Sequence, residues 1–283
     1  MNSKAIKRQL LAAIAMVLVA ALALGSSTYA WFAASGNVTA KGMQVTAQAE
    51  SGILIKVFGA ENSAYGTVAT TTKSATLFPV STANLSNWYH SSSTDIQSEQ
   101  GGTNNTVGYT PITENLDSYR LVETFTIRSA TDTAISNAKL QIAALDVTAG
   151  NQTPDLNKSV RVGVLVSGGA ADDCAFYIYA PKTTTTSSDD KGNYFQLGAK
   201  YDGSTATQLK EYTAVGSTGK EDYLKLKNNT IPADDTTLTV DIFVWYEGED
   251  PGCKTVSILN SENMNVLTPD TISVSVTFKQ AAA

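Results

Sequence analysis

Apolar and polar residues alternate along most of the chain beyond residue 40, and the alternating stretches are rich in β-branched and aromatic residues. Successive side chains of a β-strand point to opposite faces, so this period of two predicts strands with one buried face. In the last such stretch, Ile272, Val274, Val276 and Phe278 all fall on one face. The strands predicted in this way cover residues 53–58, 121–128, 139–147, 159–167, 174–180, 237–246 and 271–279.

Helical periodicity is weak throughout the chain, so the pattern predicts an all-β fold. Residues 208–215 are expected to form a short helix, and the pattern of residues 256–266 is ambiguous. Many strands separated by turn residues, without a regular alternation of strand and helix, indicate an antiparallel jelly roll or β-sandwich. The polar tracts 65–116 and 182–219 are interpreted as long loop excursions from this β core rather than as separate domains.

The first thirty residues have the three zones of a secretory signal peptide. Lys4, Lys7 and Arg8 form a basic start, residues 10–24 are an unbroken apolar run, and Ala30 ends a short stretch suited to signal peptidase. As a helix, the apolar run would be about 22 Å long, which is shorter than the roughly 30 Å of a bilayer core. This length favours a removable signal over a membrane span.

We therefore expect residues 1–30 to form a signal-peptide helix that touches the membrane only transiently, and signal peptidase to cut between Ala30 and Trp31. The alternative is an uncleaved anchor that extends through Trp31 and Phe32 as interfacial aromatics. Cleavage would shorten the chain from 283 to 253 residues and remove three basic residues, so that the formal net charge changes from −6 to −9.

The composition predicts a folded, exported domain. Hydrophobic residues make up 42% of the chain and charged residues only 16%, which is typical of a globular protein rather than a disordered one. An acidic chain without a basic patch argues against nucleic acid and against anionic lipid surfaces as partners. The expected organisation is a signal peptide at residues 1–30, a short segment at residues 31–41 and a single jelly-roll-like domain at residues 42–283.

Candidate catalytic and metal-binding residues are sparse. His90 is the only histidine, which excludes a site with several histidine ligands, and the chain has no G-x-S-x-G motif, P-loop or dinucleotide-binding motif. Acidic residues cluster at positions 172–173, 189–190 and 247–250, which we interpret as solvated turns, with a loose calcium site as the alternative. We expect no enzyme activity, no bound metal and no cofactor.

The two cysteines, Cys174 and Cys253, each lie near the end of a predicted strand. In an exported protein such a pair favours a disulfide. The bridge would close a loop of about 80 residues and contribute on the order of 4 kcal/mol in the chain-entropy description. Two buried free thiols are the alternative.

The segment that cleavage would expose, residues 31–41, begins with an aromatic pair and gains β character toward its end. An exposed, unpaired strand of this kind promotes aggregation, so it either folds back as an edge strand of its own domain or pairs with an open sheet in another copy. Repeated donation from each copy to the next is a non-closing contact that builds filaments, with the chain itself as partner. The predicted donor-strand residues are Trp31, Phe32, Ala34, Val38 and Ala40.

The run GSSTYAWF at residues 25–32, followed by Gly42 and an alternating strand, resembles the start of the TasA/camelysin group of bacterial biofilm-matrix fibre proteins. The resemblance implies a secreted jelly-roll subunit, processing by a dedicated signal peptidase and polymerisation by exchange of an N-terminal donor strand. It assigns Ala30 as the cleavage position, Phe32 as the start of the donated strand and Gly42 as the hinge into the domain.

These observations lead to three hypotheses on function. The first is a non-enzymatic structural subunit of an extracellular filament, secreted or held at the bacterial cell surface. The second is a secreted or surface-anchored adhesin or carbohydrate-binding β-sandwich that uses exposed aromatics at Trp88, Tyr89, Tyr109 and Tyr119. The third is a secreted hydrolase, because such an enzyme needs only two carboxylates brought together by the fold.

Overall fold

The computed structural model describes residues 38–50, 52–82, 84–91, 109–149, 159–166, 176–180, 209–211, 222–233, 238–247 and 272–282. All of them belong to one compact unit, which spans Asn37–Ala283. The predicted signal peptide, the cleavage between Ala30 and Trp31, and the two cysteines lie outside the described residues.

The described part of the chain is all-β, with three short 3-10 helices. The strands are β1 Val38–Glu50, β2 Ile53–Val57, β3 Val68–Leu77, β4 Tyr89–Ser91, β5 Tyr109–Pro111, β6 Leu121–Ser129, β7 Ile135–Ser136, β8 Ala138–Ala149, β9 Val160–Val166, β10 Phe176–Ala180, β11 Leu209–Glu211, β12 Asp222–Leu224, β13 Thr230–Ile231, β14 Thr239–Tyr246 and β15 Ile272–Ala282. The 3-10 helices are η1 Asn62–Ala64, η2 Leu116–Ser118 and η6 Lys227–Asn229.

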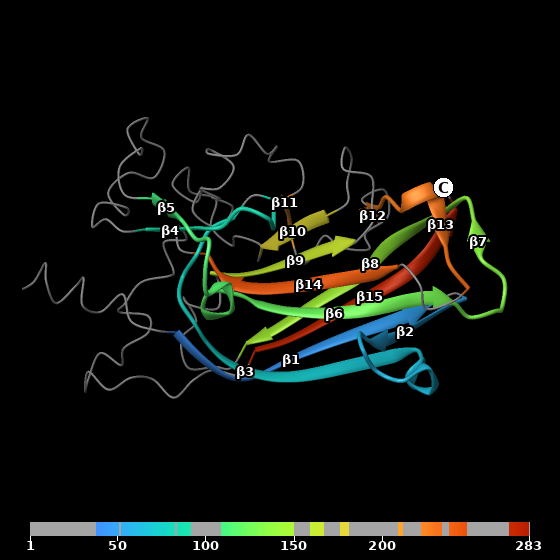
Figure 1. The fold of residues 1–283 in the computed structure, drawn as a ribbon, viewed down its shortest axis with the longest axis horizontal. Helices are drawn as coiled ribbons and strands as arrows, with labels where there is room; N and C mark the ends of the chain where they lie inside the picture. The colour runs from blue at the N-terminus through green and yellow to red at the C-terminus, as the bar shows by residue number, and fades with distance from the viewer. Residues whose placement is uncertain are drawn as a thin grey trace, which may run out of the picture. The chain divides into compact units, whose positions relative to one another are not determined.

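The strands form two main sheets, both visible in Figure 1. The first sheet, called sheet A, has the order β12-β8-β15-β1-β3, and the second, called sheet B, has the order β11-β10-β9-β14-β6-β2. Two small ladders, β13-β7 and β4-β5, complete the described strands. Most neighbours are antiparallel, but β1 pairs with β15 and β10 pairs with β11 in parallel, so the prediction of a purely antiparallel fold is wrong for these two pairs.

Sheets A and B pack face to face around one hydrophobic core. Alternate residues of the strands point inward, as the sequence pattern predicts, and the larger hydrophobic cluster contains residues from both sheets. Sheet A contributes, among others, Val45, Ala47, Leu140, Val274, Val276 and Phe278, and sheet B contributes Ile55, Phe125, Ile127, Val164, Val240 and Val244.

A bulge in β8 keeps its apolar residues on the core side. Ala138, Leu140 and Ile142 are buried in one phase of the alternation, and Leu145 is buried in the opposite phase. The pairing with β15 shifts at the same place, where Ala143 is the extra residue. One extra residue reverses which face the following side chains occupy, so the bulge lets both halves of β8 face the core.

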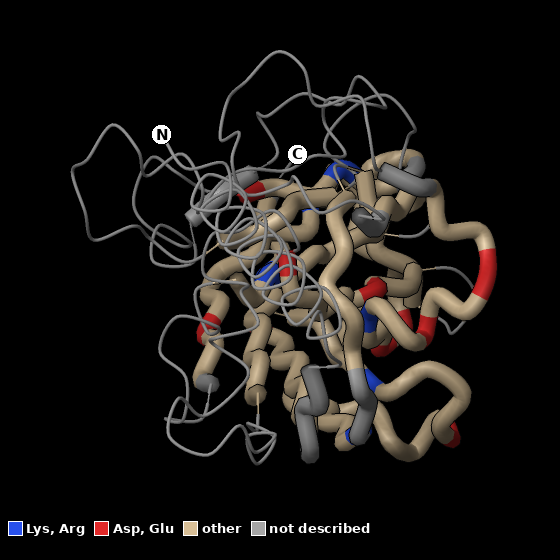
Figure 2. The backbone as a smooth tube through the Cα atoms, turned by 90° about the vertical axis from the view of Figure 1, so that its left-hand side faces the viewer, with Lys and Arg blue, Asp and Glu red and all other residues tan. Residues whose placement is uncertain are grey.

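The outward face of sheet A is polar and largely uncharged. Thr46 and Thr70 share a hydrogen bond of 3.1 Å across neighbouring strands, and the Gln48 side-chain amide donates to Ser275 Oγ at 3.4 Å. Figure 2 shows the basic and acidic residues of the described chain interspersed along the tube, with long stretches of other residues between them. This sheet face is therefore wetted mainly by hydroxyl and amide groups.

The seven strands predicted from the sequence are confirmed within the described residues, with ends that differ by at most three residues. Two other predictions are wrong, one about a loop and one about a helix. The tract 65–116 contains β3, a full strand of sheet A, and residues 209–211 of the predicted helix 208–215 form the strand β11.

Candidate functional site

The first strand of the domain begins inside the predicted donor segment. Val38, Thr39 and Ala40 pair with Leu77, Thr76 and Ala75 of β3 in the same chain. For Val38 and Ala40 the structure therefore shows the first of the two alternatives, in which the segment folds back on its own domain. Trp31, Phe32 and Ala34 lie outside the described residues.

Gly42, the predicted hinge, lies within β1 rather than before it. The register with β3 shifts between Ala40 and Met43, so that Lys41–Gly42 form a bulge in the strand. Three pairs precede this bulge, and the regular pairing resumes at Met43 opposite Lys73. A bulge interrupts the ladder and bends the strand, so the three terminal pairs form a separate short unit at the start of β1.

Both sheets have open edges within the described residues. In sheet A the edge strands are β12 and β3, and in sheet B they are β11 and β2. The outer side of β2 is partly covered, because Ile55 and Gly66 exchange two backbone hydrogen bonds of 2.8 and 3.0 Å. By contrast β3 runs for ten residues and pairs only with β1 among the described strands.

A further open edge lies in β6, because β2 is too short to cover it. β14 pairs with β6 from Leu121 to Thr126, but β2 pairs with it only from Phe125 to Ser129. We call residues 121–124 the open stretch of β6. On the β2 side of this stretch the ladder continues by one bond among the described residues, from Phe58 N–H to the Thr124 carbonyl at 2.9 Å.

The direction of the backbone groups in the open stretch follows from that bond. The N–H and C=O of one residue point to the same side of a strand, and the side alternates along the chain. Because the Thr124 carbonyl faces β2, the N–H of Thr124 and both backbone groups of Val122 point the same way. Among the described residues, no strand pairs with Val122 on this side.

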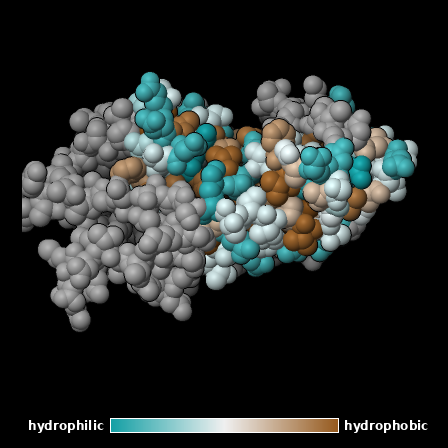
Figure 3. Space-filling model, turned by 60° about the horizontal axis from the view of Figure 1, so that its bottom comes forward, coloured by the Kyte–Doolittle hydropathy of each residue, from teal (hydrophilic) through white to brown (hydrophobic). Residues whose placement is uncertain are grey.

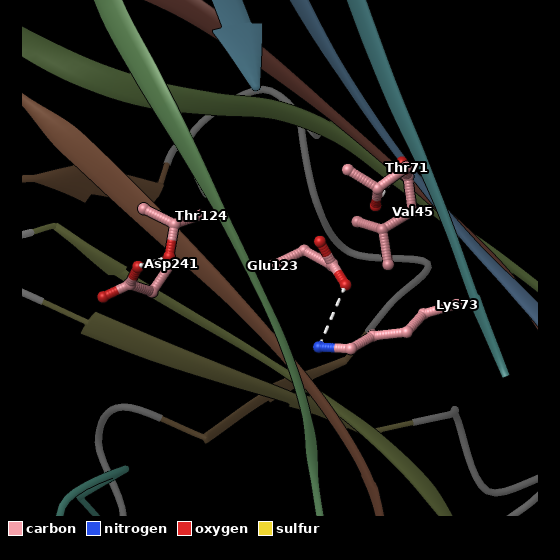
Figure 4. A network of polar contacts seen from close by, with 6 residues as sticks. All are labelled: Val45, Thr71, Lys73, Glu123, Thr124 and Asp241. Carbon is pink, nitrogen blue, oxygen red and sulfur yellow. Dashed lines mark hydrogen bonds and ion pairs between the residues drawn. The ribbon is translucent and has the colours of Figure 1, made fainter. Parts of the chain in front are cut away.

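Charged side chains lie on the inner faces of the sheets at this margin. Lys73 of β3 pairs directly with the buried Met43 of β1, and the Lys73 Nζ lies 3.6 Å from Oε1 of Glu123 on β6. Figure 4 shows this ion pair reaching from sheet A to sheet B. The side chains are 54% and 14% exposed, so the pair sits at the water-accessible margin of the core rather than inside it.

Neighbouring polar groups in Figure 4 are paired locally. Thr71 Oγ1 donates to the Val45 carbonyl at 3.4 Å, and Thr124 Oγ1 donates to Asp241 Oδ1 at 2.6 Å. Thr124 and Asp241 lie on the outward face of sheet B, to which Phe243 and Trp245 also point. The Lys73–Glu123 pair lies on the inner side of the sheet.

Two large apolar side chains are exposed in the described part of the chain: Phe58, 63% exposed, and Val68, 53% exposed. Phe58 follows β2 and contacts the open stretch through its backbone bond to Thr124. Val68 begins the edge strand β3. Figure 3 shows apolar atoms among pale and hydrophilic ones on the face that it brings forward.

Three of the aromatic residues proposed as a binding platform have described side chains, and none of the three is exposed in this way. Trp88 is only 1% exposed, and Tyr89 and Tyr119 are half-buried. Trp88 stacks on Phe243 at 6.0 Å and meets Trp245 edge-on at 5.2 Å between ring centroids. The prediction that Trp88 is an exposed aromatic is therefore wrong.

Trp88 is buried because residues 78–82 and 84–91, which we call the strap, cover the outward face of sheet B. Phe243 and Trp245 of β14 point to that face and form a second hydrophobic cluster with Val80, Leu85 and Trp88. The run IFVWY at residues 242–246 is continuously apolar, which is the pattern of a strand buried on both faces. That signal could have identified the cover from the sequence.

A tight polar turn positions the strap. Thr82 Oγ1 accepts the Leu85 N–H at 3.1 Å and donates to the Asn87 carbonyl at 2.7 Å. Leu85 has a φ of 61°, and its carbonyl accepts the Trp88 Nε1–H at 3.1 Å. These bonds hold Leu85 against Gly163 of β9, where the absence of a side chain makes room for it.

Arg120 joins this cluster through its charge. Its guanidinium carbon lies 4.7 Å from the Trp88 ring centroid and 5.1 Å from that of Phe243. Burial lowers the pKa of Arg120 from its ordinary value, and the carboxylates of Asp117 and Asp241 oppose this shift. The cation therefore fixes the strap to sheet B.

Two residues considered as possible metal or catalytic residues, Glu247 and His90, lie in the described part of the chain. Glu247, expected in a solvated turn, is fully buried, and it accepts a hydrogen bond from Trp245 Nε1 at 3.4 Å. His90 lies in β4, opposite Thr110. Among the described residues, no group of three His, Cys, Asp or Glu side chains is placed to hold a metal ion.

The part of the chain that the structure describes contains no helix long and apolar enough to span a membrane. Comparison of the chain with protein-family models, with curated proteins and with solved structures finds no match in any of the three.

Proposed function

We propose that the protein is a structural subunit of an extracellular filament, and that it polymerises when one copy donates its N-terminal segment to the next. The resemblance of residues 25–32 and Gly42 to the TasA/camelysin fibre proteins supports this proposal. So does the all-β architecture with two open sheets, which we propose is a jelly roll. The subunit would be exported after cleavage at Ala30 and would act without a cofactor.

The observation that carries the proposal is the way in which β1 begins. Val38–Ala40 are attached to an edge strand by only three pairs, and the bulge at Lys41–Gly42 separates them from the rest of β1. The regular register from Met43 onward does not include these pairs. Residues 31–37, which precede them, would therefore be the part that is donated while the rest of the domain stays folded.

The proposal is tested by imaging the full chain collected from the medium of a secreting bacterial host. Negative-stain electron microscopy should show filaments for the parent chain and none for a variant lacking residues 31–37. The deleted variant should remain a folded monomer with an unchanged far-ultraviolet circular dichroism spectrum. Deletion of residues 183–188, a polar run of similar length, is the matched control and should leave filaments intact. Filaments of the variant lacking residues 31–37 would reject the donor role.

The adhesin alternative loses its central aromatic, because Trp88 is buried under the strap. It makes a different prediction for the same preparation. An adhesin would stay monomeric and be retained on a polysaccharide matrix, whereas a filament subunit pellets on ultracentrifugation without any glycan.

A further inference from the structure

Three features meet where β2 ends beside β6. The Val122 N–H and C=O and the Thr124 N–H point away from β14 along the open stretch of β6. The Lys73–Glu123 ion pair crosses from sheet A just inside this edge. The exposed Phe58 ring flanks it at the end of β2. We call this place the slot.

The slot is suited to bind an extended peptide rather than a small molecule. Its unpaired groups are backbone donors and acceptors spaced as in a β-ladder, and such groups are best satisfied by another strand. Phe58 already lies opposite Thr124, so among the described residues the part of the open stretch without a facing strand is residues 121–123, roughly 10 Å long at about 3.4 Å per residue. An occupant of three to four residues would fill it, with apolar side chains favoured beside Phe58.

We infer that the slot accepts residues 31–34 of a second copy of this chain, an inference that rests on the proposed function. These four residues, WFAA, are apolar and uncharged, and the next three, SGN, are the types found in turns and linkers. The described domain begins immediately after them, at Val38. Seven extended residues reach about 23 Å, so a four-residue strand and a three-residue linker fit between the two domains.

The Lys73–Glu123 ion pair closes the empty slot. It holds β3 toward β6 where none of the described strands of sheet B lies between them, and it keeps two charges at the margin of the core. A half-exposed ion pair contributes little to stability, so the entering segment displaces it at small cost.

Proline substitution tests the backbone pairing. Val122→Pro removes an N–H that faces the slot and leaves the bonds between β6 and β14 in place. We expect it to raise the critical concentration for filament formation at least tenfold. Val68→Pro is the matched control, because the Thr67 carbonyl accepts the Ala49 N–H and the Val68 N–H therefore points away from β1 at another edge. It should change the critical concentration less than twofold.

Photo-crosslinking identifies the occupant, and it does not depend on how well the proline variants fold. Phe32 is replaced by p-benzoylphenylalanine, and filaments are grown from a mixture of ¹⁵N-labelled and unlabelled full chains. Mass spectrometry should find crosslinks of mixed isotope composition between position 32 and residues 121–124.

The two levels of the proposal fail in different ways. Parent chains that form no filaments would overturn the filament function and the slot together. Filaments in which position 32 crosslinks to its own chain, or to β3 or β12 of a neighbour, would overturn the slot and leave the filament function standing. Equal assembly of the Val122→Pro and Val68→Pro variants would do the same.

Discussion

Replacement of Trp88 by alanine is the sharpest test of the described architecture. The side chain is 1% exposed and lies between the strap and the outward face of sheet B. It contacts two aromatic rings of β14, it lies under the Arg120 guanidinium, and its Nε1–H donates to the Leu85 carbonyl. The substitution removes all of these contacts at once.

The expected loss is about 4 kcal/mol in the free energy of unfolding. Truncation of a buried Trp or Phe to Ala costs about 3–5 kcal/mol, which includes the cavity that remains. A cation–π contact adds about 0.5–2 kcal/mol, depending on its burial. The lost hydrogen bond adds little, because the Leu85 carbonyl keeps a 3.4 Å contact with Arg120 Nη1. Since whole domains are stable by about 5–15 kcal/mol, the variant should be close to unfolding.

Urea unfolding followed by far-ultraviolet circular dichroism measures this loss, because fluorescence would be altered by the substitution itself. With a slope of about 3 kcal/mol per M, the midpoint should fall by more than 1 M. Phe58→Ala is the control, since that ring is 63% exposed and its removal should change stability by no more than about 0.5 kcal/mol. A loss below about 1 kcal/mol for Trp88→Ala would refute the buried strap and restore Trp88 as a candidate binding residue.

Three further substitutions test other parts of the fold. Gly163→Ala places a Cβ 2.5 Å from Leu85 Cδ2, so overpacking should outweigh the entropic gain and lower the free energy of unfolding, measured by urea, by about 1 kcal/mol net. Phe278→Ala, at a fully buried position of β15, should cost about 3–5 kcal/mol by the same measurement. Tyr179→Phe removes the 3.0 Å bond to Asp222 Oδ2 between the two sheets and should cost about 1–3 kcal/mol. Burial, with the Asp222 charge, raises the pKa of Tyr179 well above its usual value, so the parent should lose stability as the pH rises above about 10 and the Tyr179→Phe variant should lose less.

The alternation of apolar residues predicted the strands well because burial in this fold has a simple period. In β15, Ile272, Val274, Val276 and Phe278 all face the core, as the sequence indicates. The alternation of apolar and polar residues does not extend to β3, because its inward positions Ala69, Thr71 and Lys73 are small or polar. An edge strand at a wet margin needs few apolar residues, so it is not visible in a pattern that reports burial.

The pairing of distant strands could not be predicted from the chain. β1 lies parallel to β15, more than two hundred residues away, and no local turn sets that register. The burial of Trp88 was missed for a related reason, because the residues around it are polar. Its partners, Phe243 and Trp245, are in β14 and carry the only local sign that the sheet is covered on both faces.

The surfaces of the described domain favour backbone pairing over side-chain chemistry as its means of interaction. The strap covers much of the outward face of sheet B, and the outward face of sheet A carries hydroxyl and amide groups, including two cross-strand pairs, Thr46–Thr70 and Gln48–Ser275. Within the described residues, the largest unmet demand is that of edge-strand N–H and C=O groups along β3 and the open stretch of β6. Water can form hydrogen bonds with these groups in a monomer. Another strand forms a regular ladder of hydrogen bonds with them and buries apolar side chains as well. A domain built in this way gains most from a partner that supplies an extended segment, and under the proposed function that partner is a second copy of the same chain.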